Sequence, residues 1–67
     1  MNADRINVSW DLDKKKWLVR IQVGGEVIRR YCNEPQTADD QTLRTAAEKT
    51  AIDEGYQVEA GAVSVAR

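Results

Sequence analysis

The chain has 67 residues, of which 42% are hydrophobic and 31% are charged, a composition typical of one small globular domain rather than of a disordered segment. Its single cysteine, Cys32, excludes an internal disulfide and favours a reducing cytoplasm. The net charge of −1 argues against a dedicated nucleic-acid-binding domain, although the charge is uneven: residues 1–36 carry seven basic and five acidic side chains, and residues 37–67 carry three and six.

The first two predicted elements are strands that form a hairpin. A strand is expected over about residues 5–12, where hydrophobic and polar residues alternate with a period of two. A polar loop over 13–16 leads into a second strand over about 16–23. Pairing Leu12 with Trp17 across this loop brings the hydrophobic residues of both strands onto one face, and two alternations that agree in one register predict the hairpin.

A second hairpin follows, with a third strand over about residues 26–32. Its turn is Gly24-Gly25, since glycine accepts the positive φ angles of a two-residue turn. The register places Arg20 opposite Arg29. One face is predicted to be buried, and the other, which is basic and partly aromatic, is predicted to be open to water. The buried set is Trp17, Val19, Ile21, Val23 and Ile28, and the open set is Leu18, Arg20, Gln22, Val27, Arg29 and Tyr31.

A helix is predicted over about residues 38–54, after Pro35 breaks the sheet. Thr37 is the expected N-cap and Gly55 the expected stop. Ile52 lies outside the hydrophobic stripe, so that either the helix has begun to unwind there or Ile52 contacts something outside the core. The stripe consists mostly of small side chains that let a helix lie close to a sheet, namely Leu43, Ala46, Ala47, Thr50 and Ala51.

The tail predicts a short strand over about residues 62–66, after a loop or bulge at Gly61 where the alternation changes phase. This strand would run parallel to either edge, the first strand or the third, and the sequence leaves both open. The predicted fold is therefore α+β in one domain spanning 1–67. It has a three- to four-stranded, mostly antiparallel sheet, the element order β-β-β-α-β, and one helix packed on one face.

The residue types that usually carry catalysis are scarce. Histidine is absent, which removes the common catalytic triads and nearly all catalytic zinc sites. The carboxylate pairs Asp39-Asp40 and Asp53-Glu54 lie at the ends of the predicted helix, where acidic residues usually serve as caps or solvated charges. Cys32 falls on the buried face as a small hydrophobic residue. We therefore expect a protein that is not an enzyme and that uses no cofactor and no metal.

The open sheet face is the predicted feature that points to a function. Arg20 opposite Arg29 is unfavourable, because like charges repel across a strand pair. The simpler alternative is a solvated face without a function, in which Ser9 lies beside Arg20 and Asp11 lies diagonally from it. If the face binds a partner, the candidate residues are Lys14, Leu18, Arg20, Arg29 and Tyr31.

Within residues 14 to 52 one pattern consists of Lys16-Trp17-Leu18-Val19-Arg20-Ile21, the glycine turn, Arg29-Arg30-Tyr31, Thr37-Ala38-Asp39-Asp40 and Ala46-Ala47. This pattern resembles the three-strand-plus-helix DNA-binding domains of phage-type integrases and of a class of plant transcription factors. Those domains lay the open sheet face in a major groove, and the resemblance implies that Arg20, Arg29 and Lys14 contact DNA. The chain departs from them in its acidic helix and in the strand that follows the helix.

Taken together, the patterns predict a small non-enzymatic binding module that acts through the open sheet face or an edge strand. The expected partner is another protein or a second copy of the chain, and nucleic acid is the alternative. No signal peptide or membrane-spanning stretch is evident, so the expected location is the cytoplasm. No small-molecule substrate is indicated. The identity of the partner and the oligomeric state stay open.

Overall fold

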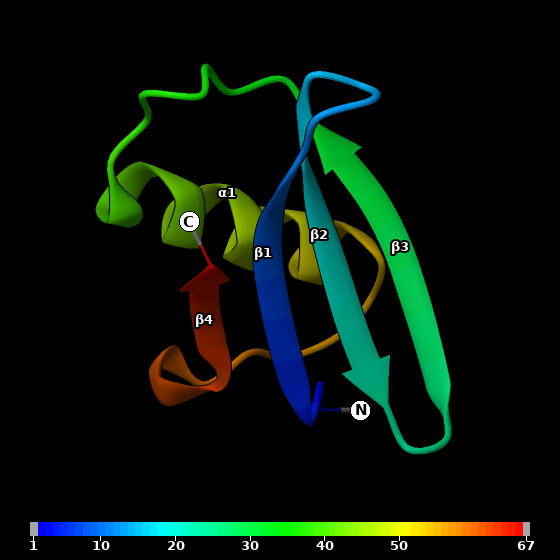
Figure 1. Ribbon diagram of the computed structural model, residues 1–67. Helices are drawn as coiled ribbons and strands as arrows, with labels where there is room; N and C mark the ends of the chain where they lie inside the picture. The colour runs from blue at the N-terminus through cyan, green and yellow to red at the C-terminus, as the bar shows by residue number, and fades with distance from the viewer. Residues whose placement is uncertain (1, 67) are drawn as a thin grey trace.

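The computed structural model describes residues 2–66, except for the side chain of residue 60, and shows a four-stranded sheet with one long helix (Figure 1). The sheet order is β3-β2-β1-β4, in which β4 runs parallel to β1 and the other neighbours are antiparallel. The predicted α+β class and element order are confirmed. The elements are β1 (Arg5–Asp11), β2 (Lys16–Val23), β3 (Glu26–Cys32), α1 (Asp40–Asp53), the short 3-10 helix η1 (Ala60–Ala62) and β4 (Val63–Ala66).

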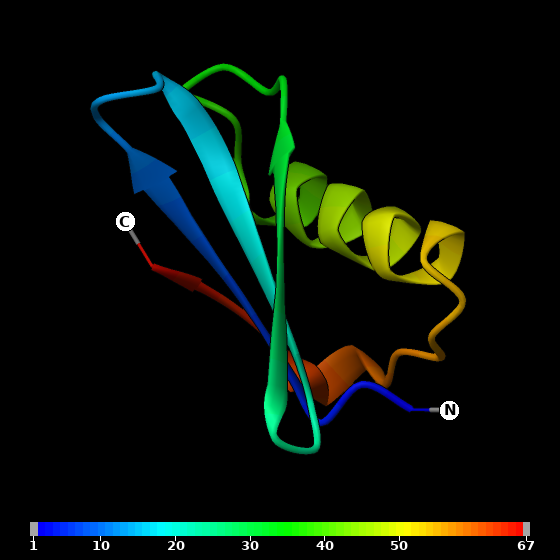
Figure 2. The same ribbon diagram turned by 90° about the vertical axis from the view of Figure 1, so that its right-hand side faces the viewer.

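The helix α1 packs on one face of the sheet and leaves the opposite face uncovered by any element of residues 2–66 (Figure 2). Between the two layers lies the hydrophobic core, whose burial drives folding. Val23 and Ile28, predicted on the buried face, are half-buried and pack against this core. The side chains that are at most 3% exposed are Ile6, Val8, Trp17, Val19, Ile21, Leu43, Ala47, Ala51 and Val63.

The register of the first hairpin differs from the prediction by two residues. Trp10, and not Leu12, lies opposite Trp17. The turn therefore covers residues 12–15, and the side chain of Leu12 is 75% exposed instead of buried. A shift of two residues keeps every strand side chain on its predicted face, because the alternation has a period of two. Apart from Leu12, the predicted core side of the first hairpin is therefore confirmed, although the predicted pairing is wrong.

Hydrogen bonds to Asp11 explain the shifted turn. Its Oδ1 accepts from the backbone N–H groups of Asp13 at 3.0 Å and Lys14 at 3.1 Å. Its carbonyl oxygen accepts from the N–H of Lys15 at 2.7 Å, and Lys15 adopts a left-handed φ of 55°. These bonds satisfy the backbone of the turn locally, which stabilises a turn that starts after Asp11 over one that starts after Leu12.

The second hairpin forms as predicted. Arg20 lies opposite Arg29 and Leu18 lies opposite Tyr31. Gly24 adopts a φ of 59°, which the tight turn requires and which glycine accepts without steric cost.

The indole of Trp17 fixes the loop after β3 to the core. Its Nε1 donates a hydrogen bond to the carbonyl oxygen of Pro35 at 2.8 Å, and the N–H of Ala38 donates to the same oxygen at 3.0 Å. The ring of Trp10 meets that of Trp17 edge-on, with centroids 5.3 Å apart. Because its polar group is satisfied, Trp17 is 99% buried without a desolvation penalty for its N–H.

The helix begins two residues later than predicted, at Asp40, and its N-cap is Asp39 rather than Thr37. The side chain of Asp39 accepts a hydrogen bond from the N–H of Thr42 at 2.8 Å. Three residues that can cap a helix lie within four positions, namely Thr37, Asp39 and Asp40. The turn that runs from Pro35 to Ala38 includes Thr37, so the helix begins after it and Asp39 serves as the cap.

The helix ends at Asp53, and Gly55 terminates it as predicted, with a φ of 94°. The N–H of Gly55 donates to Ile52 O and the N–H of Tyr56 donates to Ala51 O, which is the Schellman arrangement. Since the helix continues past Ile52, unwinding does not explain that residue. Its side chain lies outside the core and is 62% exposed.

The last strand, β4, joins β1 and not β3, which settles the choice between the two edges. The pairs are Ile6 with Val63 and Val8 with Val65, all on the core side. On the core side of β3 stands Arg30, so a pairing with β3 would have placed a valine of β4 beside a charged side chain. Burial of hydrophobic side chains therefore favours pairing with β1. The short helix η1 stands at the predicted phase change before this strand.

Candidate functional site

The open face of the sheet is organised in rows of side chains that cross the strands, because residues paired between neighbouring strands point the same way. One row contains both Arg20 and Arg29, and we call it the arginine row. It lies between a row of small and apolar side chains and a row that ends at the exposed Val27. Read from β4 toward β3, the arginine row is Ser64, Asn7, Arg20 and Arg29; the apolar row is Ala66, Ser9, Leu18 and Tyr31; and the third row is Arg5, Gln22 and Val27.

Arg20 and Arg29 are both exposed and lie directly opposite one another. Like charges at such positions, where Cβ atoms are about 5 Å apart, destabilise a strand pair. The predicted neighbours of Arg20 on β1 are wrong. The corrected register places Asn7 beside Arg20, and both Ser9 and Asp11 lie further along the strand. Among the residues that the structure describes, no carboxylate forms an ion pair with either arginine.

Tyr31 and Leu18 supply the apolar part of the candidate face. Leu18 is half-buried, and the side chain of Tyr31 is 44% exposed. The hydroxyl of Tyr31 donates a hydrogen bond to Oδ2 of Asp11 at 3.1 Å. This bond fixes the position of the tyrosine ring over the β1–β2–β3 surface and brings a carboxylate to its tip.

The two partners of that hydrogen bond shift each other's ionisation. The pKa of Asp11 lies below its ordinary value of 3.8, first because the N–H of Lys14 donates to it and further because Tyr31 does. The pKa of Tyr31 is raised above 10.0, chiefly by partial removal from water and then by the hydrogen bond to Asp11. Near neutral pH the face therefore presents a protonated phenol beside a fixed negative charge.

The structure brings four of the five predicted site residues together, in two adjacent rows, and places Lys14 in the turn at the end of the face. The ammonium charge of Lys14 contributes to the lowered pKa of Asp11. The sequence missed Asn7 and Ser64 as members of the arginine row. The outward direction of Asn7 was readable from the alternation in β1, whereas the place of Ser64 depends on the edge that β4 joins.

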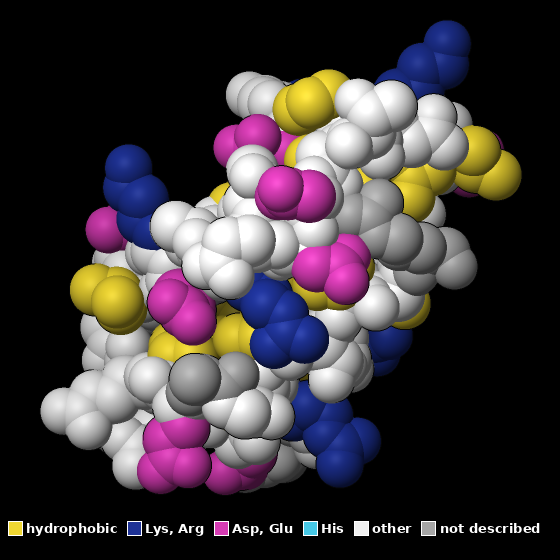
Figure 3. All heavy atoms as spheres, turned by 90° about the vertical axis from the view of Figure 1, so that its left-hand side faces the viewer, with side chains coloured by type: hydrophobic (Ala, Val, Ile, Leu, Met, Phe, Trp, Pro, Cys, Tyr) yellow, Lys and Arg dark blue, Asp and Glu magenta, His cyan; other side chains and the backbone are white. Residues whose placement is uncertain are grey.

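The two free edges of the sheet differ from the open face. The edge strand β3 carries Glu26, Arg29 and Arg30, and charges along an edge oppose pairing with a further strand. The edge strand β4 is only four residues long. Viewed from the β4 side, basic and acidic side chains are intermingled with small hydrophobic areas (Figure 3).

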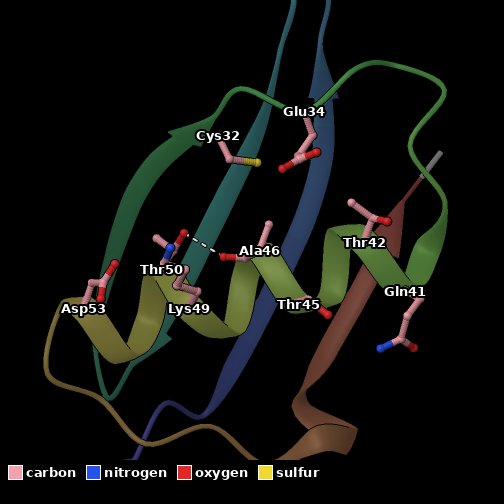
Figure 4. Close-up of a pocket in the computed structure, with 9 residues that line it drawn as sticks. All are labelled: Cys32, Glu34, Gln41, Thr42, Thr45, Ala46, Lys49, Thr50 and Asp53. Atoms are coloured by element: carbon pink, nitrogen blue, oxygen red, sulfur yellow. Dashed lines mark hydrogen bonds between the residues drawn. The ribbon is translucent and has the colours of Figure 1, made fainter.

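A groove of about 550 Å³ lies on the helix side, between α1 and the end of β3 (Figure 4). Cys32 and Glu34 line one wall, while Lys49 and Thr50 belong to the helix. Cys32 is half-buried, and burial raises the pKa of its thiol, so that the sulfur is protonated and weakly nucleophilic near neutral pH. The hydroxyl of Thr50 donates to Ala46 O at 2.8 Å and so has a partner within the helix.

Residues 2–66 offer neither a metal-binding cluster nor a membrane-spanning helix. No group of three or more His, Cys, Asp or Glu side chains in this part of the chain is placed to hold a metal ion. No helix within it has the length and apolar content needed to cross a membrane. Among known proteins, no family model matches the chain, and no curated protein and no solved structure is significantly similar to it.

Proposed function

We propose that this protein is a small non-enzymatic binding module, which captures another protein on the open face of its sheet. The observation that supports the proposal is the pair Arg20 and Arg29, exposed, directly opposed and without a carboxylate partner among the described residues. Arginine and tyrosine are enriched at protein interfaces, and Tyr31 lies in the neighbouring row. The module works in the cytoplasm, in keeping with its single thiol, and needs neither a membrane nor a small-molecule substrate.

The test compares three immobilised forms of the protein. These are the wild type, the face variant Arg20→Ser/Tyr31→Ser, and the control variant Gln41→Ser/Lys49→Ser, which alters exposed helix residues on the other side of the sheet. The wild type and the control should retain the same partner from a cell extract, and the face variant should lose it. All three should unfold at similar temperatures. A partner that the face variant retains in full would contradict the proposal.

Nucleic-acid binding through the same face is the second candidate. Within the four strands, all of which the structure describes, the open face carries four cations, Arg5, Lys16, Arg20 and Arg29, against one anion, Asp11. Each phosphate neutralised by such a cation releases a counterion, so this affinity should fall steeply as salt is added.

Labelled protein titrated with mixed short DNA and RNA at low salt distinguishes the two candidates. Nucleic-acid binding predicts amide shifts confined to Arg20, Arg29, Tyr31 and the turn over residues 12–15, reversed by salt. An unchanged spectrum would rule against this second candidate and leave a protein partner.

A further inference from the structure

We infer that the open face recognises an acidic segment of polypeptide, in which Arg20 and Arg29 each bind one carboxylate. The inference rests on the proposed binding function of that face and names the chemistry of the partner. A carboxylate on each guanidinium would replace the repulsion between the two arginines by two charge-assisted hydrogen-bonded pairs, and these are stronger than neutral hydrogen bonds.

The spacing of the two arginines suits this partner. They stand on neighbouring strands, which lie about 4.8 Å apart. Their long side chains allow the charged ends to spread to about 7 Å, the distance between carboxylates two residues apart in an extended chain. Asn7 and Ser64 continue the same row across β1 and β4. Both are short polar side chains that can donate further hydrogen bonds along a bound chain.

Apolar side chains on both sides of the arginine row indicate what accompanies the carboxylates. Leu18 and Tyr31 lie on one side, and Val27, which is 40% exposed, lies on the other. A partner that covers this face therefore buries hydrophobic side chains next to its acidic ones. The best fit is an amphipathic acidic segment rather than a uniformly charged one.

Asp11 favours polypeptide over nucleic acid as the source of the negative charge. Its ionised carboxylate accepts the hydroxyl hydrogen bond of Tyr31 and so stands at the tip of the one aromatic ring on the face. A nucleotide stacked on that ring would bring its phosphate toward this carboxylate. A leucine or valine side chain would cover the same ring without any such repulsion.

The experiment uses the whole chain and three labelled probes: a short peptide with the repeat Glu-Leu-Glu-Ser, the same peptide with Gln in place of every Glu, and a single-stranded DNA of equal charge. The Glu peptide should bind the wild type. The Gln peptide should bind with an affinity at least about tenfold lower. Arg20→Gln and Arg29→Gln should each weaken Glu-peptide binding by about tenfold. The control Lys49→Gln should change it by less than about twofold.

Three outcomes would overturn the inference: equal binding of the Glu and Gln peptides, tighter binding of the DNA than of the Glu peptide, or no peptide binding at all. None of them removes the proposed binding function if the Arg20→Ser/Tyr31→Ser variant still loses its natural partner. Conversely, a natural partner held equally by that variant defeats the proposed function whatever the probes do. The two failures are therefore distinguishable.

Discussion

Asp11 links the turn after β1 to the open face, since its carboxylate accepts hydrogen bonds from both the turn and Tyr31. Its pKa is depressed when folded, so the stability that it contributes is present above about pH 3.8 and is lost as the pH falls through the folded value. The pKa of Tyr31 is raised, so its contribution is present below about pH 10 and is lost as the pH rises through the folded value.

We therefore expect an NMR titration to give a pKa for Asp11 below 3.8 and a pKa for Tyr31 above 10.0. In Tyr31→Phe the pKa of Asp11 should move up toward its ordinary value, because one of the hydrogen bonds to the carboxylate is lost. The bonds from the turn stay in place, so the pKa should remain depressed in part. An Asp11 titration that is identical in both proteins would show that the tyrosine hydroxyl is not bound there.

The helix cap offers a second prediction at this scale. Asp39→Ala removes the side chain that accepts from the N–H of Thr42, and it should lower the free energy of unfolding by about 1 kcal/mol. Thr37→Ala is the matched control and should change stability by less than about 0.5 kcal/mol, since Thr37 is exposed and precedes the cap. Urea unfolding of the two variants measures both values. A larger loss in Thr37→Ala would restore Thr37 as the cap.

Among the elements, the first hairpin shows best what the sequence could predict. The period of two assigns each side chain of β1 and β2 to a face, and this assignment needs no knowledge of the pairing. The pairing itself is decided by hydrogen bonds of Asp11 within the turn, which compete with the hydrophobic match that favoured Leu12. Local polar bonds of this kind leave no periodic trace in the sequence.

The same distinction explains the other outcomes. The stripe of α1 and the stop at Gly55 follow from helical spacing and from backbone sterics, and both were predicted. The edge that β4 joins depends on which edge strand offers only apolar side chains on the core side. These are Ile6 and Val8 on β1, whereas β3 offers Ile28 and Arg30. This comparison needs the three-dimensional arrangement. For that reason the arginine row was predicted only over its β2 and β3 members.

The corrected register makes a prediction for the elements. Leu12→Ser should change the free energy of unfolding by less than about 0.5 kcal/mol, because the side chain is 75% exposed in the turn. Ile21→Ala, at a fully buried position of β2, should cost about 2–5 kcal/mol. Thermal or urea unfolding compares the two. If Leu12→Ser proved as damaging as Ile21→Ala, the pairing of Leu12 with Trp17 would be correct after all.

At the scale of the whole molecule, charge is distributed unevenly in a way that costs stability. Residues 37–67 carry three basic and six acidic side chains, whereas the open face gathers cations on β1, β2 and β3. Acidic residues at the start of α1 are favourable there, because they lie at the positive end of the helix dipole. The opposed pair Arg20 and Arg29 has no comparable stabilising contact within the fold, although Arg29 also places a charge on the edge strand β3. A pair that lowers the stability of a small domain and lies on its uncovered face is consistent with the proposed binding function.

This explanation predicts opposite effects on stability and on binding. Arg29→Glu turns the repelling pair into an attracting one, and it should raise the free energy of unfolding by about 0.5 kcal/mol in low salt and by less in high salt. The same variant should lose the Glu peptide. Arg20→Glu/Arg29→Glu restores like charges, so its stability should fall back, and the comparison isolates the pair. Urea unfolding at two salt concentrations provides the measurement. An Arg29→Glu variant that is less stable than the wild type would mean that the arginines do not repel in the folded protein, and the opposed pair would then no longer support the proposed binding function.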